Sequence, residues 1–565
     1  MLEIFLFSLL TSIQIIISGY LFHHLFISKK SSDLNIFTLG LLGFVFIGFI
    51  GIFLNFFVSL NKFLNDIFFI LPFLLFCIFF FNNIIFKKIF FFSILISIFF
   101  TITVAFDNHY IPDAGSYHLP FVSILNENKI IVGSNNLHYR FGHTSIMQYI
   151  SALYNNHLFG DNGISIPLGL LYCFFVGFLI VEILNSKDNR VLYIFLFIIL
   201  SFVLFRMNRY SDLGNDGPAN IFFFYLIVET LKNYSVNYKI RITSILAVFI
   251  FLNKITLLLG FLIPIYLIFK NFNVKAIINK TNIFSFIFLS LFILKNFFVS
   301  GCLAFPLEQT CIKKVFWFND QNSYNVKYVR AENEAWTKGW PNQNEPKKNH
   351  FDYISNFEWF NTWKFNHGKV IIKKISPFLI FLSIMSFFLY FSNKKALNLK
   401  NFKEKMPKGD FLNYFLIGLC LTGSLIWFFK FPVFRYGYGY LISFFAISIS
   451  MLLKNLSVFY RPEKLNKNIL IIFVVLLCGV SVKNLIRIAS NYENINSAWP
   501  QIYSNDQKYT KQDYKPVFKN SKILFYKNEK NTCYYSTSPC THLLDFNFNN
   551  LNMMLVYGYK VYYFK

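Results

Sequence analysis

Residues 33–58 read DLNIFTLGLLGFVFIGFIGIFLNFFV, and no charged residue follows Asp33 until Lys62. A helix needs roughly 20 apolar residues to cross about 30 Å of hydrocarbon, so this stretch predicts a transmembrane helix. Similar stretches along the chain predict an all-α polytopic membrane protein with about 14 transmembrane helices. Asn253 and Lys254 interrupt the apolar run at 242–270, which leaves open a hairpin or one long helix. The predicted spans are 4–28, 33–58, 65–86, 89–106, 164–185, 191–206, 217–233, 242–253, 255–270, 282–299, 371–393, 411–430, 433–453 and 468–487.

The composition excludes most other classes of protein. The chain has 565 residues, of which 55% are hydrophobic and only 14% are charged, whereas about 25% is usual in soluble domains. Disordered chains, coiled coils and secreted disulfide scaffolds are excluded by this composition. Yet 53 Lys and Arg residues oppose 27 Asp and Glu residues, a net charge of +26. Nucleic acid, anionic lipid and loop topology are the three explanations for such a surplus.

The distribution of charge among the loops favours membrane topology as the explanation for the surplus of positive charge. Twenty-two lysines and arginines, among them Lys87 and Lys88, fall in one set of alternate loops, and short cationic loops stay in the cytoplasm. The segments 107–163, 300–370 and 488–565 then lie outside, together with both termini. The first span lacks the basic start of a cleavable signal peptide. We therefore expect a bacterial inner-membrane protein with periplasmic termini, in contact with membrane lipids and with no nucleic-acid partner.

The long outside segments divide the chain into parts. Transmembrane helices are expected in 1–106, 164–299 and 371–487, and outside segments in 107–163, 300–370 and 488–565. Cysteines pair closely in two of the outside segments, as Cys302 with Cys311 and Cys533 with Cys540. Disulfides persist in an oxidising compartment, and neither spacing is that of a zinc knuckle. Two disulfides are therefore favoured over a metal site. KILFYK and YKVYYFK near the C-terminus predict short strands, hence a small C-terminal α/β or β domain.

The segment 107–163 contains the strongest candidates for chemistry. It holds Asp107, Asp113 and five of the ten histidines, including His109 and His118. Carboxylates at a membrane boundary are suited to general-base catalysis or metal binding. Solvated loop residues are the alternative interpretation. His138 and Arg140 follow a Gly-Asn-rich turn and are candidates for phosphate binding, since a guanidinium matches phosphate oxygens. The alternative for Arg140 is a salt bridge to Asp107 or Asp113.

Other candidates interrupt or flank apolar spans. Arg206, Arg209, Asp212 and Asp216 share a second outside connection, so Asp216 could face Asp113 across a cavity. Lys254 inside an apolar stretch and Arg435 at a span end are candidates for contact with a lipid phosphate. The segment 300–370 holds five of the seven tryptophans, whose rings suit either sugar stacking or anchoring at the membrane interface.

Residues Asp113 to Tyr117, DAGSY, resemble the D-E-x-x-Y motif in the first outside loop of the GT-C glycosyltransferases. This superfamily includes the lipid-A aminoarabinose transferases and the protein mannosyltransferases. The resemblance implies that Asp113 is the base that takes a proton from the acceptor while a sugar leaves its lipid phosphate. Ala114 stands in place of the second acid of the motif. The site therefore lacks one of the carboxylates that a mechanism with paired carboxylates or a bound metal ion would use.

A closer resemblance, covering most of the chain, is to a poorly characterised family of bacterial membrane proteins with a GT-C-like layout. It rests on DAGSYHLP at 113–120, VGSNNLHYRFGHTS at 132–145, DGP at 216–218, SGCLAFPL at 300–307, RYGYG at 435–439 and PCT at 539–541. This resemblance implies the fold and a class of reaction, but no substrate.

We expect a glycosyltransferase that moves a sugar from a polyprenyl-phosphate donor to an outside lipid or glycan acceptor. A transporter or flippase of lipid-linked saccharides and a glycan polymerase are the alternatives. The sequence has no nucleotide-binding loop and identifies no cofactor, and a divalent cation stays open. The predicted catalytic residues are Asp113 and His118. The predicted substrate-binding residues are Asp107, Tyr117, His138, Arg140, Asp216, Lys254 and Arg435.

Overall fold

The computed structural model is mostly helical, and ten helices of its described part are long and apolar enough to cross a membrane. The structure describes residues 1–27, 35–80, 82–107, 113–186, 189–206, 213–270, 277–318, 325–340, 349–391, 411–454, 462–493, 498–500, 514–519, 523–528, 533–536, 538–541 and 550–564. The ten spans are Leu2–Ile27, Ile36–Phe57, Lys62–Phe79, Asn83–Val104, Gly160–Asn185, Val236–Asn253, Lys280–Ser300, Phe411–Lys430, Phe434–Leu453 and Val474–Asn491.

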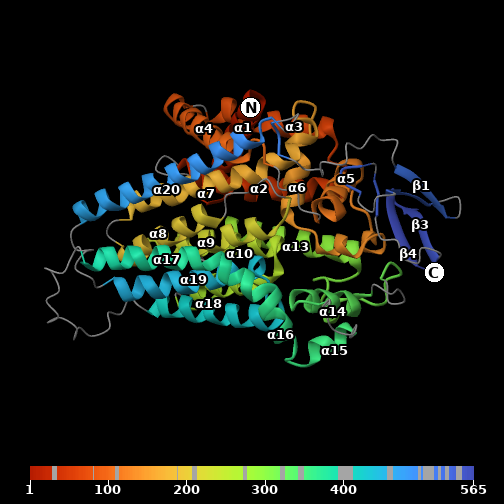
Figure 1. Cartoon of the computed structure of the whole chain (residues 1–565). Coiled ribbons are helices and arrows are strands. Elements are labelled where there is room, and N and C mark those ends of the chain that lie inside the picture. The colour runs from red at the N-terminus through yellow and green to blue at the C-terminus, as the bar shows by residue number, and fades with distance from the viewer. Residues whose placement is uncertain are drawn as a thin grey trace.

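The long helices run side by side in a bundle (Figure 1). They are α1 (Leu2–Phe22), α2 (Ile36–Phe57), α3 (Lys62–Phe79), α4 (Asn83–Val104), α7 (Ile166–Asn185), α8 (Arg190–Arg206), α9 (Asp216–Leu231), α10 (Val236–Asn253), α11 (Leu262–Lys270), α13 (Lys280–Ser300), α17 (Lys369–Phe391), α18 (Phe411–Lys430), α19 (Phe434–Leu453) and α20 (Pro462–Asn491). A helix thus occupies each predicted span, although α8, α9 and the stretch Ile255–Lys270 are shorter than a full crossing.

The turn between the third and fourth spans was predicted at the wrong place. The sequence analysis put Lys87 and Lys88 in a loop, but both lie near the start of α4. Asn82 causes the earlier start, because its side chain accepts hydrogen bonds from the backbone N–H groups of Ile84 and Ile85 and so caps the helix.

Glycines allow α1 and α2 to pack in direct backbone contact. A Cβ atom on Gly19 would lie 1.8 Å from the carbonyl oxygen of Leu39, and one on Gly43 would lie 2.1 Å from that of Ile15. Small residues are the usual means of close helix approach in membranes, where lipid provides no hydrophobic drive for association. This contact fixes the positions of α1 and α2 relative to one another.

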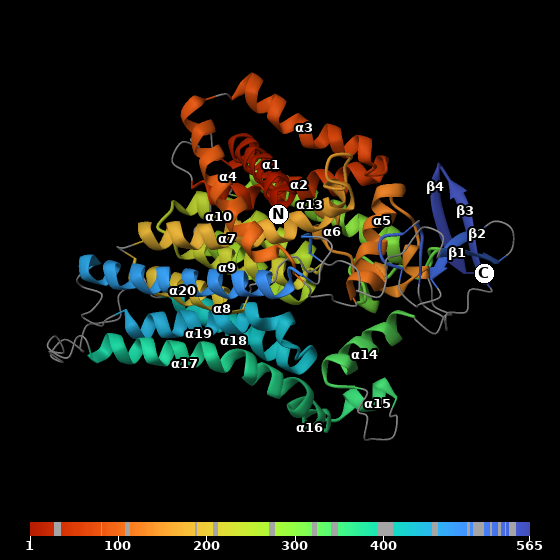
Figure 2. The same cartoon turned by 45° about the horizontal axis from the view of Figure 1, so that its top comes forward.

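One end of the bundle carries the short elements, as Figures 1 and 2 both show. The segment 107–163, predicted as an outside loop, is folded there from Asp113 onward. It forms a π-helical turn (Ala114–His118), α5 (Leu119–Glu127), α6 (Ile146–Leu153) and short 3-10 turns at Ser134–Asn136, Tyr139–His143 and Gly160–Ser165, the last of which runs into the predicted span 164–185. Residues 119–126 are all buried, which explains the difference, since apolar positions within the predicted loop pack into the same hydrophobic core as the bundle helices.

The same end holds the Trp-rich segment and the C-terminal strands. Helices α14 (Val326–Thr337), α15 (His350–Ser355) and α16 (Trp359–Trp363) belong to the former, with short turns at Glu308–Thr310 and Lys364–Gly368. Two antiparallel pairs of strands follow near the C-terminus. In the first, β1 (Tyr514–Lys519) pairs with β2 (Ile523–Asn528), and Tyr514 lies opposite Asn528. In the second, β3 (Leu551–Val556) pairs with β4 (Tyr559–Phe564), and Leu551 lies opposite Phe564. Both predicted disulfides, Cys302–Cys311 and Cys533–Cys540, are present.

The start of α1 lies at this end too. The ring of Phe7 is 4.7 Å from that of Phe159 and 5.6 Å from that of Trp499. β4 contacts the same folded segment, through a parallel bridge between Val561 and Val132. The first helix therefore begins, and the last strand ends, against the segment that contains Asp113.

The glycine contact between α1 and α2 can be tested by substitution. We expect Gly19→Ala to lower the thermal unfolding temperature of the purified protein in detergent, because the new methyl group must push the two backbones apart. Overpacking of this kind costs about 1–3 kcal/mol. Gly418→Ala in α18 is the matched control, since its Cβ atom would have no neighbour within 4 Å. Equal unfolding temperatures for the two variants would contradict the close approach.

Candidate functional site

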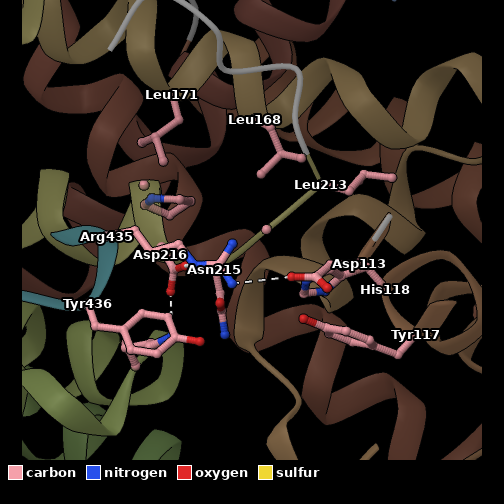
Figure 3. A pocket seen from close by; sticks show the side chains of 14 residues that line it. Asp113, Tyr117, His118, Leu168, Leu171, Leu213, Asn215, Asp216, Arg435 and Tyr436 are labelled. Atoms are coloured by element: carbon pink, nitrogen blue, oxygen red, sulfur yellow. Dashed lines mark hydrogen bonds and ion pairs between the residues drawn. The ribbon is translucent and has the colours of Figure 1, made fainter. Parts of the chain in front are cut away.

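Four charged side chains from four separate elements meet at one cavity of about 180 Å³. They are Asp113, Asp216, Lys254 and Arg435, and Figure 3 shows the two aspartates and Arg435 facing one another there. Each was singled out by the sequence analysis, and the fold brings them together from positions up to 322 residues apart. The cavity lies where several helices of the bundle begin or end, with Leu168, Leu171 and Leu213 among its apolar lining.

Helix ends place all four side chains. Asp113 directly precedes the π-helical turn at Ala114–His118, and Asp216 is the first residue of α9. Arg435 is the second residue of α19. Lys254 has extended backbone angles between α10 and the 3-10 turn Ile255–Phe261, so the interrupted run at 242–270 forms two helical elements with this lysine at the break. A charged group at a helix end reaches a cavity without removing any hydrogen bond from the helix interior.

Arg435 bridges the two aspartates. Its Nη2 atom lies 3.3 Å from Oδ2 of Asp113, and its Nε atom lies 3.3 Å from Oδ2 of Asp216. The Lys254 ammonium group donates to the other oxygen, Oδ1, of Asp216. Two carboxylates and two cations therefore compensate one another. The side chains of Asp113 and Arg435 keep 37% of their surface exposed, against 20% for Asp216, so Asp113 is the more accessible carboxylate.

Aromatic rings enclose the cations. The Lys254 ammonium lies 3.6 Å from the ring centre of Tyr436, and the Arg435 guanidinium lies 5.5 Å from that of Trp336 on α14. These cation–π contacts stabilise positive charge in a partly desolvated place. The phenol groups of Tyr117 and Tyr436 point toward one another across the cavity (Figure 3).

Asn220 fixes the backbone that carries Arg435. Its amide nitrogen donates to the Arg435 carbonyl oxygen at 3.1 Å, and its amide oxygen accepts from the Gly439 N–H at 2.7 Å. Asn220 is buried in α9, one turn after Asp216. One side chain thus sets the spacing between the two helices whose first turns supply Asp216 and Arg435.

His118 lines the cavity in its neutral form. Ser145 and Gln148 form a capping box at the start of α6, in which Oε1 of Gln148 accepts from the Ser145 N–H at 2.9 Å. The Gln148 amide nitrogen therefore donates to Nδ1 of His118, 3.1 Å away. Burial lowers the pKa of His118 to about 4, and this effect exceeds the opposing attraction of Asp113 and Asp216. The ring carries no charge at neutral pH.

Arg140 lies behind Tyr117, outside the cavity lining. Its Nη1 atom donates to Oδ1 of Asn333 on α14 at 2.6 Å, and its guanidinium lies 5.9 Å from the Tyr117 ring centre. Asn333 also contacts Nε2 of His143 at 3.2 Å, whose pKa is held well below its usual range by burial. Neither of the two salt bridges considered for Arg140, to Asp107 or to Asp113, is the contact it makes here.

Six of the nine predicted site residues line the cavity, and three do not. Asp113, Tyr117, His118, Asp216, Lys254 and Arg435 are in the lining. His138 is buried and accepts from the Arg140 N–H through Nδ1, which caps the turn Tyr139–His143. Asp107 is buried at the end of α4. His109, Arg209, Asp212 and the side chain of Arg206 lie outside the described residues.

Tyr436, Asn220 and Gln148 contact the site but are not among its predicted residues. Only Gln148 carries a signal of its own, since the spacing Ser145-x-x-Gln148 is that of a capping box. For a metal ion, Asp113 and Asp216 are the available carboxylates, and Arg435 already faces both. No group of three or more His, Cys, Asp or Glu side chains suited to a metal occurs within the described ranges.

Comparison with known proteins shows the family to which the chain belongs. A search of curated proteins and a search of solved structures each found none that matches this chain. Residues 1–442 match a family model described as "Domain of unknown function (DUF8201)", so the match includes all four charged residues of the cavity. Because it covers more than half of the sequence, the chain belongs to the DUF8201 family.

Proposed function

We propose that this protein is a membrane glycosyltransferase of the GT-C type, with Asp113 as its catalytic base. The proposal rests on one observation above the others: Asp113, the accessible carboxylate, shares a cavity with two cations at the end of an apolar bundle. The proposed donor is a sugar on a polyprenyl phosphate, and the acceptor is a lipid or glycan. The proposed location is the bacterial inner membrane, with the cavity and both termini on the periplasmic side.

The reaction assigns a role to each charged group. The acceptor hydroxyl gives its proton to the Asp113 carboxylate while its oxygen forms a bond to the anomeric carbon of the sugar. The bond between that carbon and the phosphate oxygen breaks, and its electron pair leaves with the lipid phosphate. Lys254 and Arg435 face the departing phosphate, for which an ammonium and a planar guanidinium are both suited.

The charge balance supports this assignment. In the resting cavity the charges of Asp113 and Asp216 cancel those of Lys254 and Arg435. Once Asp113 takes the proton, the four groups carry a net charge of +1, at the moment when the phosphate gains negative charge. Arg435 also loses its attraction to Asp113 and can turn toward the leaving group. Stabilisation that appears only as the reaction proceeds lowers the barrier rather than strengthening ground-state binding.

His118, the second predicted catalytic residue, has a different part in this mechanism. Its Nδ1 atom already accepts from Gln148, so the proton of the neutral ring is on Nε2. In that state His118 can orient a substrate hydroxyl as a hydrogen-bond donor but cannot take a proton at Nδ1. The base role therefore belongs to Asp113.

We expect Asp113→Asn to reduce the transferred product by about 100-fold or more, since a positioned base contributes about 10²–10⁴-fold to rate. Mass spectrometry of the surface glycans and lipids of cells that carry wild-type or variant protein measures this. Asp66→Asn is the matched control, because Asp66 pairs with exposed His157 and not with the cavity.

An unchanged glycan profile with normally inserted Asp113→Asn protein would contradict the role of Asp113. Accumulation of the same complete saccharide on the wrong side of the membrane would instead favour a flippase. Altered chain length with unchanged monomer linkage would favour a polymerase.

We expect Arg435→Lys to reduce product by about ten- to hundred-fold, because a lysine can face one aspartate but not both. A hydrogen bond to a charged group is worth about 1.5–3 kcal/mol, which sets this range. The same glycan measurement applies, with protein level followed in parallel. Arg241→Lys is the control, since Arg241 donates to the Ile27 carbonyl oxygen and does not line the cavity. Full activity of Arg435→Lys would show that the bridge is dispensable.

The neutral state of His118 predicts a pH dependence of stability. Its pKa is about 4 in the folded protein and 6.5 when unperturbed, so the unfolded chain binds more protons between these values. Stability is therefore lost as the pH falls from 6.5 toward 4. We expect the unfolding temperature of His118→Gln to drop less than that of wild type between pH 7 and pH 4.5. His143 contributes equally to both proteins, and identical drops would contradict the buried neutral ring.

A further inference from the structure

We propose that a disulfide-closed segment near the C-terminus is the positioning element for Asp113. This segment, the C-terminal clip, comprises residues 533–536 and 538–541 and is closed by Cys533–Cys540. It lies beyond the residues matched by the family model and does not line the cavity. The inference rests on the proposed function only for the role of Asp113, because the clip and its contacts are independent of any reaction.

The turn after Asp113 lacks one hydrogen-bond donor of its own. In this π-helical turn, the Leu119 N–H donates to the Ala114 carbonyl oxygen five residues earlier. The next carbonyl oxygen, of Gly115, would require the N–H of residue 120, which is a proline and has none. The backbone N–H of Tyr534 in the clip donates to it instead, at 2.8 Å. A buried carbonyl group without a partner is costly, so the clip completes the turn.

Further bonds join the clip to α5, which continues from the same turn. The Ser123 hydroxyl donates to the Ser536 carbonyl oxygen, and the Ser538 N–H donates to the Glu127 carboxylate at 2.9 Å. The Tyr535 hydroxyl accepts from Asn155 at 2.5 Å and contacts Asn126. The contacts extend from the turn to the last residue of α5, so they hold this helix and the turn as one unit.

The disulfide keeps the donor in place. Tyr534 has a positive φ of 49°, a backbone conformation that is unfavourable for a non-glycine residue and persists only where its surroundings enforce it. Cys533 and Cys540, both buried, close the segment around this residue. When the bond is reduced, Tyr534 is released toward an unstrained conformation, and its N–H moves away from Gly115.

A residue before the clip also contacts the chain that precedes Asp113 in sequence. The Phe106 N–H at the end of α4 donates to the Ala498 carbonyl oxygen at 2.9 Å. β4 adds a third contact, in which the Val132 N–H donates to the Lys560 carbonyl oxygen at 3.0 Å and the Tyr562 N–H donates back to Val132 at 2.9 Å. The 106–132 region is therefore held at three points by residues 498–562, and the clip holds the point nearest to Asp113.

Hydrogen–deuterium exchange of the purified full-length protein in detergent tests the clip directly. We expect the backbone amides of residues 113–127 to exchange at least tenfold faster in Cys533→Ser/Cys540→Ser than in wild type. The matched control is Cys302→Ser/Cys311→Ser, which removes the other disulfide and should leave these amides unchanged. Equal exchange in wild type and the clip variant would overturn the proposal, as would the same increase in both disulfide variants.

A second variant separates positioning from general destabilisation. Pro120→Ala gives the turn an N–H of its own, so adding it to Cys533→Ser/Cys540→Ser should restore at least part of the protection and of the glycan product. A merely destabilised protein would gain nothing from this local donor, and lack of rescue would overturn the positioning role. If the clip variant exchanges faster while Asp113→Asn leaves the glycans unchanged, the clip holds the turn and the proposed function fails.

Discussion

The contact of Arg435 with two aspartates is the interaction on which the candidate site depends. Charges within an apolar bundle are tolerated only when they are paired or reach water, and this guanidinium pairs with carboxylates from two separate elements. Without it, Asp113 and Asp216 would face one cavity with Lys254 as the remaining cation of the cluster. The helix ends, the Asn220 contact and the aromatic rings all serve to keep that guanidinium in place.

Three of the residues that line the cavity were predicted because each interrupts or flanks an apolar span. Such a residue is costly in a membrane, so Asp216, Lys254 and Arg435 could be selected from their position alone. Sequence position is less informative within the 107–163 segment, where polar residues are common. Nearness in sequence does not determine whether a side chain there lines the cavity or lies outside its lining. Asp107, His138 and Arg140 were selected by the same reasoning as Asp113, yet they lie outside the cavity lining.

The fold shows the same division between strong and weak signals. Apolar length predicted a helix at every span. Helix α4, however, starts earlier than the charge pattern of Lys87 and Lys88 predicts, because Asn82 caps it through two hydrogen bonds. The close packing of α1 and α2 and the burial of α5 depend on which surfaces meet in three dimensions. The apolar pattern of one segment does not show which other segment it packs against, so the α1–α2 contact and the burial of α5 could be seen only in the structure.

The contacts of the clip also set an order of events during biosynthesis. Ser123 and Ser536 are bonded although 413 residues separate them. At about 5–20 residues per second, the ribosome makes the clip roughly 20–80 s after α5. During that interval α5 lacks its hydrogen-bond partners in the clip. The contacts between α5 and the clip can therefore form only after nearly the whole chain has been made.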